Sequence, residues 1–152
     1  MKHFLIVLTI ACFSLKALSQ SPEDSVKSVI NTMFAAMKNA DGNLLKSVFS
    51  DSVIFQTIGR TKEGAMVVRN ESANGFAEQV SKAAPGALDE RIVFETIKID
   101  GPLAIAWTPY NFYYNGQFSH CGVNSFQLVR LNGVWKIQYI IDTRRRQGCK
   151  MD

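Results

Sequence analysis

Hydrophobic and polar residues alternate through the last third of the sequence, a pattern that predicts two long β-hairpins. The segment HCGVNSFQLVRLNGVWKIQYIID, from His120 to Asp142, contains two alternating runs separated by Asn132-Gly133. Asn and Gly both tolerate positive φ angles, so this pair predicts a tight hairpin turn. Asn115-Gly116 predicts another such turn, between LAIAWTPYNFYY and QFSHCGV.

The two turns define a strand register, and the register assigns each side chain to one face of the sheet. One face is richer in aromatic residues and carries the one histidine beyond the N-terminal segment, so we expect it to be the inner face. Its members are His120, Asn124, Phe126, Leu128, Trp135, Ile137, Tyr139 and Ile141, joined from the preceding strand by Ile105, Trp107, Asn111 and Tyr113. The same register places Asp142 on the outer face. A bulge at Pro109, which has no N–H to donate, would instead turn Tyr110 and Phe112 inward and Asn111 outward.

The first half of the chain has helical periodicity. The stretch SPED, from Ser21 to Asp24, is a typical helix start, with a Ser cap, Pro in the first turn and acidic residues after it. An apolar stripe follows at 3.6-residue spacing, formed by Val26, Val29, Ile30, Met33, Phe34 and Met37. A short second helix and the strand VIFQTIG come next, followed by a short strand over residues 64–69, a helix over 74–83 and a strand over 91–99.

The predicted order is helix, helix, strand, strand, helix and then four strands in a meander. Consecutive strands joined by short turns pair antiparallel, and helices separated from them in sequence must cover one face of the sheet. We therefore expect an α+β domain in which a strongly curved antiparallel sheet wraps around a long N-terminal helix. The open end of such a cone is a natural pocket.

The N-terminus predicts export. A basic start, MKH, precedes the apolar run FLIVLTIACF, and the following ALS has the small residues of a cleavage site. We expect a cleaved signal peptide at 1–19 and a single domain at 20–152 that is secreted or periplasmic. Cys12 leaves a lipoprotein signal as an alternative, but Thr9 stands where such signals usually have Leu. No other stretch is apolar over the length of a membrane span, so no membrane association is expected after cleavage.

The net charge indicates which macromolecular partners to expect, and the cysteines indicate whether a disulfide can form. The formal net charge is +4, and loss of Lys2 and Lys16 with the signal peptide lowers it by two, to +2. This balance gives no reason to expect nucleic acid as a partner. Cys121 and Cys149 remain after cleavage, and an exported protein can join them in a disulfide if the chain folds back after the last strand. Two free thiols are the alternative.

Two segments together resemble the nuclear transport factor 2-like (NTF2-like) superfamily, which includes ketosteroid isomerases and SnoaL-like polyketide cyclases. The first is MFAAMKNADGNLLKSVFSDSVIF, in which a short helix ends in Phe-x-Asp before the first strand, and the second is FQLVRLNGVWKIQYI. The resemblance covers nearly the whole chain after residue 19 and suggests an exported, bacterial-type member. It implies the cone fold, a pocket inside the cone and frequent homodimers through the outer sheet face, but no single activity.

The residues disfavour the best-known chemistry of that superfamily. Ketosteroid isomerases use an aspartate base in the first strand together with acidic donors in an oxyanion hole. The position that matches the base is Gln56, whose amide cannot take a proton at neutral pH. The first helix has Met33, Phe34 and Met37 where a tyrosine donor would be expected.

His120 is the strongest candidate for chemistry, because imidazole is the only side chain with an unperturbed pKa near neutrality. On the inner face it would lie with Trp107, Asn111, Asn124 and Tyr139, in the position of a general base or of a hydrogen-bond donor to a ligand. These five residues are the predicted ligand-binding site, and His120 is the predicted catalytic residue if the protein is an enzyme. A structural histidine at the hairpin end is the alternative.

The other candidate residues give weaker indications of function. For Asp142, an ion pair with a neighbouring arginine is favoured over a dyad with His120. The run Arg144-Arg145-Arg146, with Lys150, has the chemistry to bind an anion, although such runs at a chain end are more often solvated. Cys121 and His120 point to opposite faces and do not make a nucleophile pair. One histidine and two cysteines form no recognised metal site, and no cofactor is predicted.

Three functions fit these residues. We predict an exported protein whose cone binds a small, partly apolar ligand, with no established catalysis. The first alternative is a SnoaL-type isomerase, cyclase or dehydratase with His120 as general base, and the second is a protein-interaction module that uses the outer sheet face. A homodimer through that face would cover an apolar surface formed by Tyr110, Phe112, Tyr114, Val123, Val129 and Ile140.

Overall fold

The computed structural model describes residues 21–149. The helices in this range are α1 (Pro22–Lys38), α2 (Gly42–Ser47) and α3 (Ala73–Lys82). The strands are β1 (Phe49–Arg60), β2 (Met66–Glu71), β3 (Leu88–Ile92), β4 (Thr96–Asp100), β5 (Leu103–Tyr114), β6 (Gln117–Leu131) and β7 (Val134–Arg145). The predicted signal peptide with its cleavage site, Cys12 and Lys150 lie outside the described residues.

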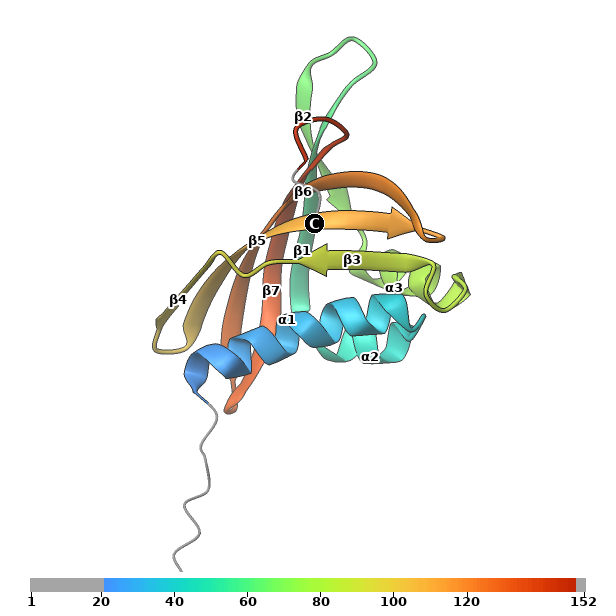
Figure 1. Ribbon diagram of the computed structural model, residues 1–152. Helices are drawn as coiled ribbons and strands as arrows, with labels where there is room; N and C mark the ends of the chain where they lie inside the picture. Colours follow the sequence, from blue (N-terminus) through green and yellow to red (C-terminus); the bar gives the residue numbers. More distant parts are fainter. Residues whose placement is uncertain (1–20, 150–152) are drawn as a thin grey trace, which may run out of the picture.

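The strands form one strongly curved sheet that wraps over α1 (Figure 1). Their order is β2-β1-β7-β6-β5-β3, and β4 also pairs with β5. Neighbouring strands are antiparallel, except that β1 and β7 are parallel. The predicted α+β cone is therefore confirmed, while the parallel contact between the first and the last strand is a long-range pairing that the sequence pattern did not predict.

Helix α1 supplies the centre of the core. It begins where predicted, because the Ser21 side chain accepts a hydrogen bond from the Asp24 N–H at 3.0 Å. Its apolar stripe faces the sheet, with Ile30 fully buried and the ring of Phe34 edge-on to Phe126 of β6 at 6.2 Å. Each fully buried side chain of this size stabilises the fold by about 1.5–3 kcal/mol, so this stripe fixes α1 against the concave face.

The single strand predicted over residues 91–99 is two strands, β3 and β4. Both pair with β5, but their registers differ by one residue. Between them, the Val93 N–H donates to the carbonyl of Pro109 at 2.9 Å. Pro109 has no N–H with which to continue the ladder, and this accounts for the interruption. The irregularity predicted at Pro109 is thus found on this side of β5.

A one-residue bulge in the β5–β6 hairpin reverses part of the predicted register. Tyr113 pairs with Phe118 but Phe112 pairs with His120, so Ser119 is the extra residue. Beyond a bulge, the residues that face each other across the hairpin change. The inner face of β5 is therefore formed by Ala104, Ala106, Thr108, Tyr110 and Phe112, instead of the predicted Ile105, Trp107, Asn111 and Tyr113.

A second bulge has the same effect in the β6–β7 hairpin. Leu128 pairs with Ile137 but Gln127 pairs with Tyr139, so Gln138 is the extra residue. Beyond this bulge, the residues of β7 that were predicted to face outward lie on the inner face instead. Those on the inner face are Ile140, Asp142 and Arg144, and those turned away from it are Tyr139 and Ile141.

Hydrogen bonds to β1 hold the second bulge in place. The Gln138 side-chain oxygen accepts from the Ser50 hydroxyl at 2.8 Å, and its Nε2 donates to the Ser52 carbonyl at 3.0 Å. The β1–β7 register shifts in the same place, between Phe49 and Ile54. The extra residue is therefore bonded to the neighbouring strand and is not a loose insertion.

The apolar outer face differs from the predicted one for the same reason. Tyr110, Phe112 and Ile140 point inward and do not belong to it, which corrects that prediction. In their place β5 exposes large apolar side chains at every second position, namely Leu103, Ile105 and Trp107, each between 44% and 47% exposed.

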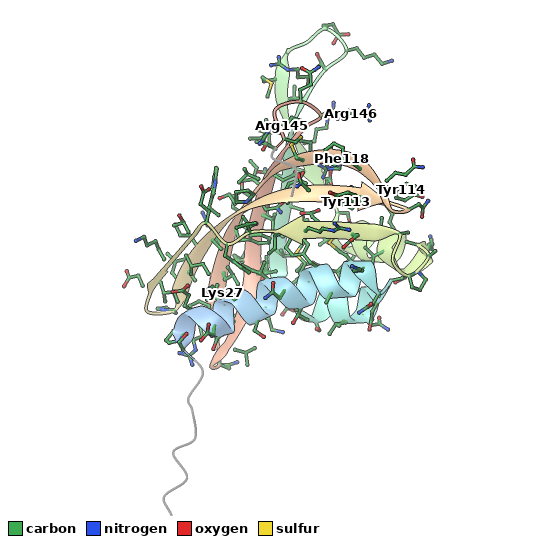
Figure 2. The ribbon with its side chains drawn as sticks, viewed as in Figure 1. Lys27, Tyr113, Tyr114, Phe118, Arg145 and Arg146 are labelled. Carbon is green, nitrogen blue, oxygen red and sulfur yellow. A yellow bond between two sulfur atoms is a disulfide. The ribbon has the colours of Figure 1, made fainter. Side chains whose placement is uncertain are left out.

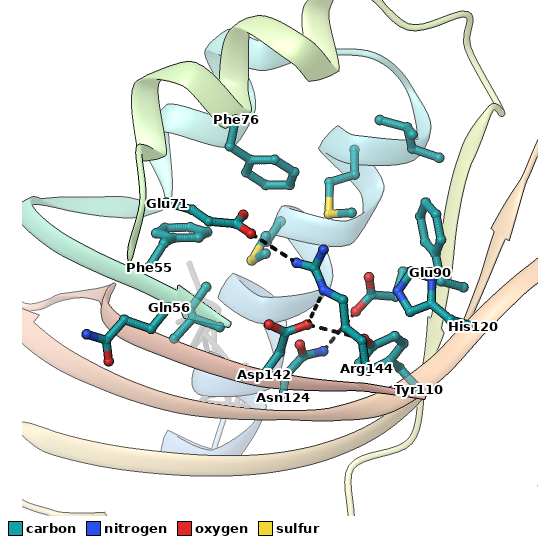
Figure 3. Close-up of a pocket in the computed structure, with 15 residues that line it drawn as sticks. Phe55, Gln56, Glu71, Phe76, Glu90, Tyr110, His120, Asn124, Asp142 and Arg144 are labelled. Carbon is teal, nitrogen blue, oxygen red and sulfur yellow. Dashed lines mark hydrogen bonds and ion pairs between the residues drawn. The ribbon is translucent and has the colours of Figure 1, made fainter. Parts of the chain in front are cut away.

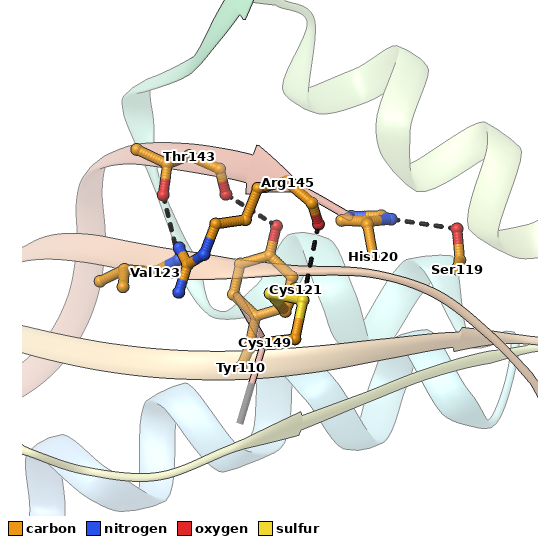
Figure 4. Close-up of a disulfide and its surroundings, with 8 residues drawn as sticks. All are labelled: Tyr110, Ser119, His120, Cys121, Val123, Thr143, Arg145 and Cys149. Atoms are coloured by element: carbon orange, nitrogen blue, oxygen red, sulfur yellow. Dashed lines mark hydrogen bonds between the residues drawn. A yellow bond between two sulfur atoms is a disulfide. The ribbon is translucent and has the colours of Figure 1, made fainter. Parts of the chain in front are cut away.

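The structure joins Cys121 and Cys149 in a disulfide (Figure 4). Cys121 lies in β6 and is buried, whereas Cys149 follows β7 and is partly exposed. The bridge spans 28 residues and ties the segment after β7 back onto β6. It lies beside Tyr110, next to His120 on the strand, so it also stabilises the part of the sheet from which the cavity is built.

Candidate functional site

A cavity of about 150 Å³ lies between the concave face of the sheet, α1 and α3 (Figure 3). One part of its wall is apolar, formed by Met33, Met37, Phe55, Phe76, Leu88, Phe112 and Ile140. The other part is polar, formed by Gln56, Glu71, Glu90, Tyr110, His120, Asn124, Asp142 and Arg144. A cavity of this volume suits a ligand about the size of a single aromatic ring.

The polar wall comes from neighbouring rows of side chains that cross the sheet. In one row, Glu90 of β3, Phe112 of β5 and His120 of β6 lie opposite one another. In a nearby row, Asn124 of β6 lies opposite Asp142 of β7. Residues paired in this way project from the same face and within contact distance, so strand pairing itself gathers these groups.

Glu90 has the carboxyl group that its surroundings alter most. Asn124 Nδ2 donates to Glu90 Oε1 at 2.8 Å. Burial raises the pKa of Glu90 to about 7; the Asn124 hydrogen bond opposes the rise, and the Asp142 carboxylate adds to it. Near neutral pH the group is therefore present in both protonated and ionised forms, as a proton-transfer catalyst or a pH-dependent binding group requires.

Arg144 lies between two carboxylates (Figure 3). Its Nε donates to Asp142 Oδ2 at 2.7 Å, and its Nη2 is 3.5 Å from Glu71 Oε1. Burial acts to lower the pKa of Arg144, but the hydrogen bond and the charge of Asp142 outweigh it and raise that pKa. The predicted Asp142–arginine ion pair is confirmed. The Arg144 charge is already matched by protein carboxylates.

Tyr110 fills a space that a glycine leaves open. Its hydroxyl is 3.2 Å from Asp142 Oδ2 and 3.1 Å from the Thr143 carbonyl oxygen, so it donates to this pair of acceptors. A Cβ at Gly122 would come within 2.8 Å of the Tyr110 ring. Burial, with the nearby carboxylates of Glu90 and Asp142, raises the pKa of Tyr110, which keeps the phenol protonated and able to donate at neutral pH.

His120 is packed between aromatic rings at the cavity wall. The Phe112 ring centroid is 5.0 Å away, and the Tyr110 ring is edge-on at 5.8 Å. His120 Nδ1 is 3.1 Å from the Ser119 hydroxyl. Burial, followed by the positive charge of Arg144, lowers the pKa of His120, although Asp142 opposes this. The imidazole is therefore neutral at pH 7 and can accept a proton or a hydrogen bond.

Two of the five predicted ligand-binding residues, His120 and Asn124, line the cavity. The predicted inner-face positions of Trp107, Asn111 and Tyr139 are wrong, because the two bulges turn these side chains away. Trp107 and Asn111 line a groove on the convex face, and the Tyr139 hydroxyl donates to a side chain of β1 at 2.6 Å.

Gln56 occupies the position that matches the isomerase base, and its amide is engaged on both sides. The Tyr139 hydroxyl donates to Gln56 Oε1, and Gln56 Nε2 donates to Asn70 Oδ1 at 2.8 Å. No proton acceptor is created there, so the carboxyl group suited to proton transfer is Glu90, on a different strand.

Sequence reasoning missed Glu90 and Glu71 and placed Asp142 on the wrong face. Glu90 bonds to a residue 34 positions later in the chain, and the Arg144–Glu71 contact joins β7 to β2 across the sheet. Only the alternative of a bulge in β5 pointed to Tyr110, and it placed that bulge at Pro109. The remaining contacts depend on strand pairings that no local motif predicts.

The arginine run does not form one patch, although Arg145 and Arg146 both lie at the end of β7 (Figure 2). Arg144 points to the cavity, whereas Arg145 lines the convex groove and Arg146 borders a shallow surface hollow. Over residues 21–149, no three His, Cys, Asp or Glu side chains are close enough to hold a metal ion. No helix in the same range has the length and apolarity to cross a membrane.

Comparison with known proteins identifies the fold. No protein-family model and no curated protein matches the sequence. An NTF2-like protein of unknown function from Shewanella baltica superposes with a TM-score of 0.66 at 14% identity, over 82% of this chain and 94% of that one. One from Methylobacillus flagellatus superposes with a TM-score of 0.61 at 16% identity, over 81% and 91%.

A third structure is a domain of unknown function with a cystatin-like fold from Nostoc punctiforme. Its TM-score is 0.64 at 16% identity, over 83% of this chain and 78% of that one. The chain therefore has the NTF2-like fold, which is the fold that the predicted resemblance implies. Identities this low carry information about fold and none about activity.

Proposed function

We propose that this protein is exported and binds a small, partly apolar ligand in its cone cavity. The observation that carries the proposal is the division of the cavity wall. Apolar side chains of α1, α3 and the sheet face one side, while Glu90, His120, Asn124 and Tyr110 converge on the other. This is the general construction of small-molecule sites, which combine an apolar enclosure with a few directed polar groups.

A matched pair of tryptophan substitutions tests this proposal. Leu88→Trp adds bulk to the cavity wall, whereas Leu103→Trp adds the same bulk at an exposed position of the convex face. One-ring compounds screened by ligand-observed NMR should bind the wild type and Leu103→Trp but not Leu88→Trp. Binders that are retained equally by both variants would place the site elsewhere and contradict the proposal.

A second candidate is acid–base catalysis in the same cavity, and the observation that favours it is the pKa of Glu90, about 7. Of the two proton-accepting side chains, Glu90 fits the general base better than His120, whose lowered pKa makes it a weaker base. For any substrate found to turn over, Glu90→Gln should abolish activity while His120→Gln reduces it less. Full activity in Glu90→Gln would exclude this candidate.

A homodimer formed through the convex face is part of the same proposal. What supports it is the row of exposed apolar side chains along β5, Leu103, Ile105 and Trp107. The groove beside this row has charged residues of both signs, including Glu95 and Arg145. A second copy related by a two-fold axis can cover the apolar row and oppose the unlike charges.

A further inference from the structure

We infer that the ligand of this cavity carries a cationic group, such as a protonated amine, that binds the carboxylate of Glu90. The inference rests on the proposed ligand-binding function and adds the chemical class of the ligand. It is carried by the way in which the charged groups of the cavity wall are paired with one another.

The cavity wall has more acidic than basic groups. Its charged side chains are Glu71, Glu90, Asp142 and Arg144. Arg144 contacts both Glu71 and Asp142, so the single cation is shared by two carboxylates. Glu90 forms no ion pair with any residue between 21 and 149, since each ion pair in that range involves other acids.

Glu90 also has unused hydrogen-bonding capacity. A carboxylate accepts about four hydrogen bonds, and among the described residues the one side-chain donor to Glu90 is Asn124. The neighbouring phenol of Tyr110 donates to Asp142 and Thr143 instead, and the Nδ1 of His120 is beside Ser119. The protein therefore leaves the carboxylate that lines the cavity without a cationic donor, and a ligand ammonium provides one.

The electrostatic field in the cavity favours a cationic ligand. The negative charge of Asp142 adds to the rise in the pKa of Glu90, and the positive charge of Arg144 offsets only part of the effect of Asp142. The other groups that face Glu90 are neutral: Asn124, the protonated Tyr110 and the uncharged His120. Helix α1 adds Met33 and Met37, which carry no charge. An added cation is attracted by this arrangement, whereas an added anion would have to displace a carboxylate from Arg144.

The apolar wall suits the rest of such a ligand. Phe55, Phe76 and Phe112 present aromatic rings to the cavity, and aromatic faces attract cations as well as apolar groups. The volume of about 150 Å³ leaves room for one ring with a short substituent. A small aromatic or alicyclic amine therefore satisfies both parts of the wall.

Binding must be linked to proton release. At neutral pH Glu90 is partly protonated, and a cation beside it favours the ionised form. A ligand that instead accepted a hydrogen bond from protonated Glu90 would cause proton uptake. The sign of the proton exchange therefore separates the two kinds of ligand without the need for a variant.

Three probes with the same ring and different head groups test the inference: benzylamine, benzyl alcohol and benzoate. Isothermal titration of the full disulfide-bonded protein at pH 7, in two buffers of different ionisation enthalpy, measures affinity and proton exchange together. We expect benzylamine to bind at least about tenfold more tightly than benzyl alcohol, benzoate to bind most weakly, and about half a proton to be released with benzylamine.

Two variants test whether the preference for benzylamine depends on the carboxylate of Glu90. Glu90→Gln should remove the advantage of benzylamine over benzyl alcohol, whereas Glu78→Gln, the same change at an exposed position of α3, should keep it. If benzyl alcohol or benzoate binds as tightly as benzylamine, or if binding takes up protons, the inference is wrong while the proposed function stands. If none of the three binds the folded wild-type protein, both are contradicted.

Discussion

At the scale of single residues, the ring of Tyr110 crosses a space that exists because residue 122 has no side chain. A Cβ at Gly122 would lie 1.8 Å from the Thr143 carbonyl oxygen and 2.8 Å from the ring and hydroxyl of Tyr110. The first contact is with backbone, which cannot move aside without separating β6 from β7. Gly122 is thus required by close approach and not by an unusual backbone angle.

Gly122→Ala should therefore destabilise the protein by about 3 kcal/mol or more, because overpacking here disturbs both the strand pair and the Tyr110 hydroxyl. The measurement is the free energy of unfolding in urea. Gly59→Ala is the control, since a Cβ there has its nearest contact at 3.6 Å. An equal, small effect of both substitutions would contradict the close packing described for Tyr110.

Glu90 makes stability depend on pH. Its pKa is about 7 in the folded protein and near the ordinary 4.5 in the unfolded chain, so the folded state binds more protons between these values. The contribution of Glu90 to the free energy of unfolding therefore falls as pH rises from about 4.5 to 7, by roughly 2–3 kcal/mol in total.

Glu90→Gln should remove this loss, so that the variant becomes progressively more stable than the wild type over that pH range and the difference levels off above pH 7. Urea unfolding at several pH values measures it. Glu78→Gln should follow the wild-type curve, because that side chain is exposed on α3. A constant difference between Glu90→Gln and wild type would show that burial does not perturb this carboxyl group.

At the scale of whole elements, the disulfide connects β6 to the segment that follows β7. It closes a loop of 28 residues that contains most of the β6–β7 hairpin, and its buried half, Cys121, is adjacent to His120. A covalent link of this span restricts the unfolded chain more than the folded one, which is how it stabilises the hairpin that carries His120, Asn124 and Asp142.

Cys149→Ala should lower the free energy of unfolding by about 3.5 kcal/mol, the amount expected for closure of a loop of this length. Reducing agent should destabilise the wild type by a similar amount and have little further effect on the variant. A wild-type protein that unfolds at the same urea concentration with and without reductant would contradict a stabilising role.

The sequence predicted the elements whose signals are local. The Ser21 cap, the apolar stripe of α1 and the two Asn-Gly turns all act within a few residues, and all are found in the structure. The curved antiparallel sheet followed from the order of these elements and their short connections.

The bulges could not be predicted in the same way, because both faces of the strands are apolar. In β7, Tyr139 and Ile141 on one face look no different from Ile137 and Ile140 on the other, so alternation does not reveal an extra residue. In β5 the first inner positions, Ala104 and Ala106, are small, and the large Trp107 faces outward. The predicted facing was therefore correct for β6 and for β7 up to its bulge. It was reversed for β5 and for the rest of β7, which placed three of the five predicted ligand-binding residues on the wrong face.

At the scale of the whole molecule, the convex face along β5 is the surface proposed to form a homodimer. Trp107 is 46% exposed in the single chain and would be buried by a second copy. Trp107→Glu should convert a dimer at tens of micromolar into a monomer, as measured by sedimentation velocity, because it places a charge in the contact. Leu131→Glu, at a similarly exposed position at the end of β6, should remain dimeric. A wild type that sediments as a monomer at these concentrations would refute the dimer.

The bulge at Gln138 has a consequence for how such cones diverge. If Gln138 paired regularly opposite Gln127, the hairpin turn and the pairing of Leu128 with Ile137 would stay intact, yet Asp142 and Arg144 would give way to their outward-facing neighbours along the rest of β7. A substitution that removes the hydrogen bonds of Gln138 to β1, and with them the bulge, can therefore replace several residues of the cavity lining in a single step. Gradual substitution at each position is not the only route by which one scaffold acquires a different ligand.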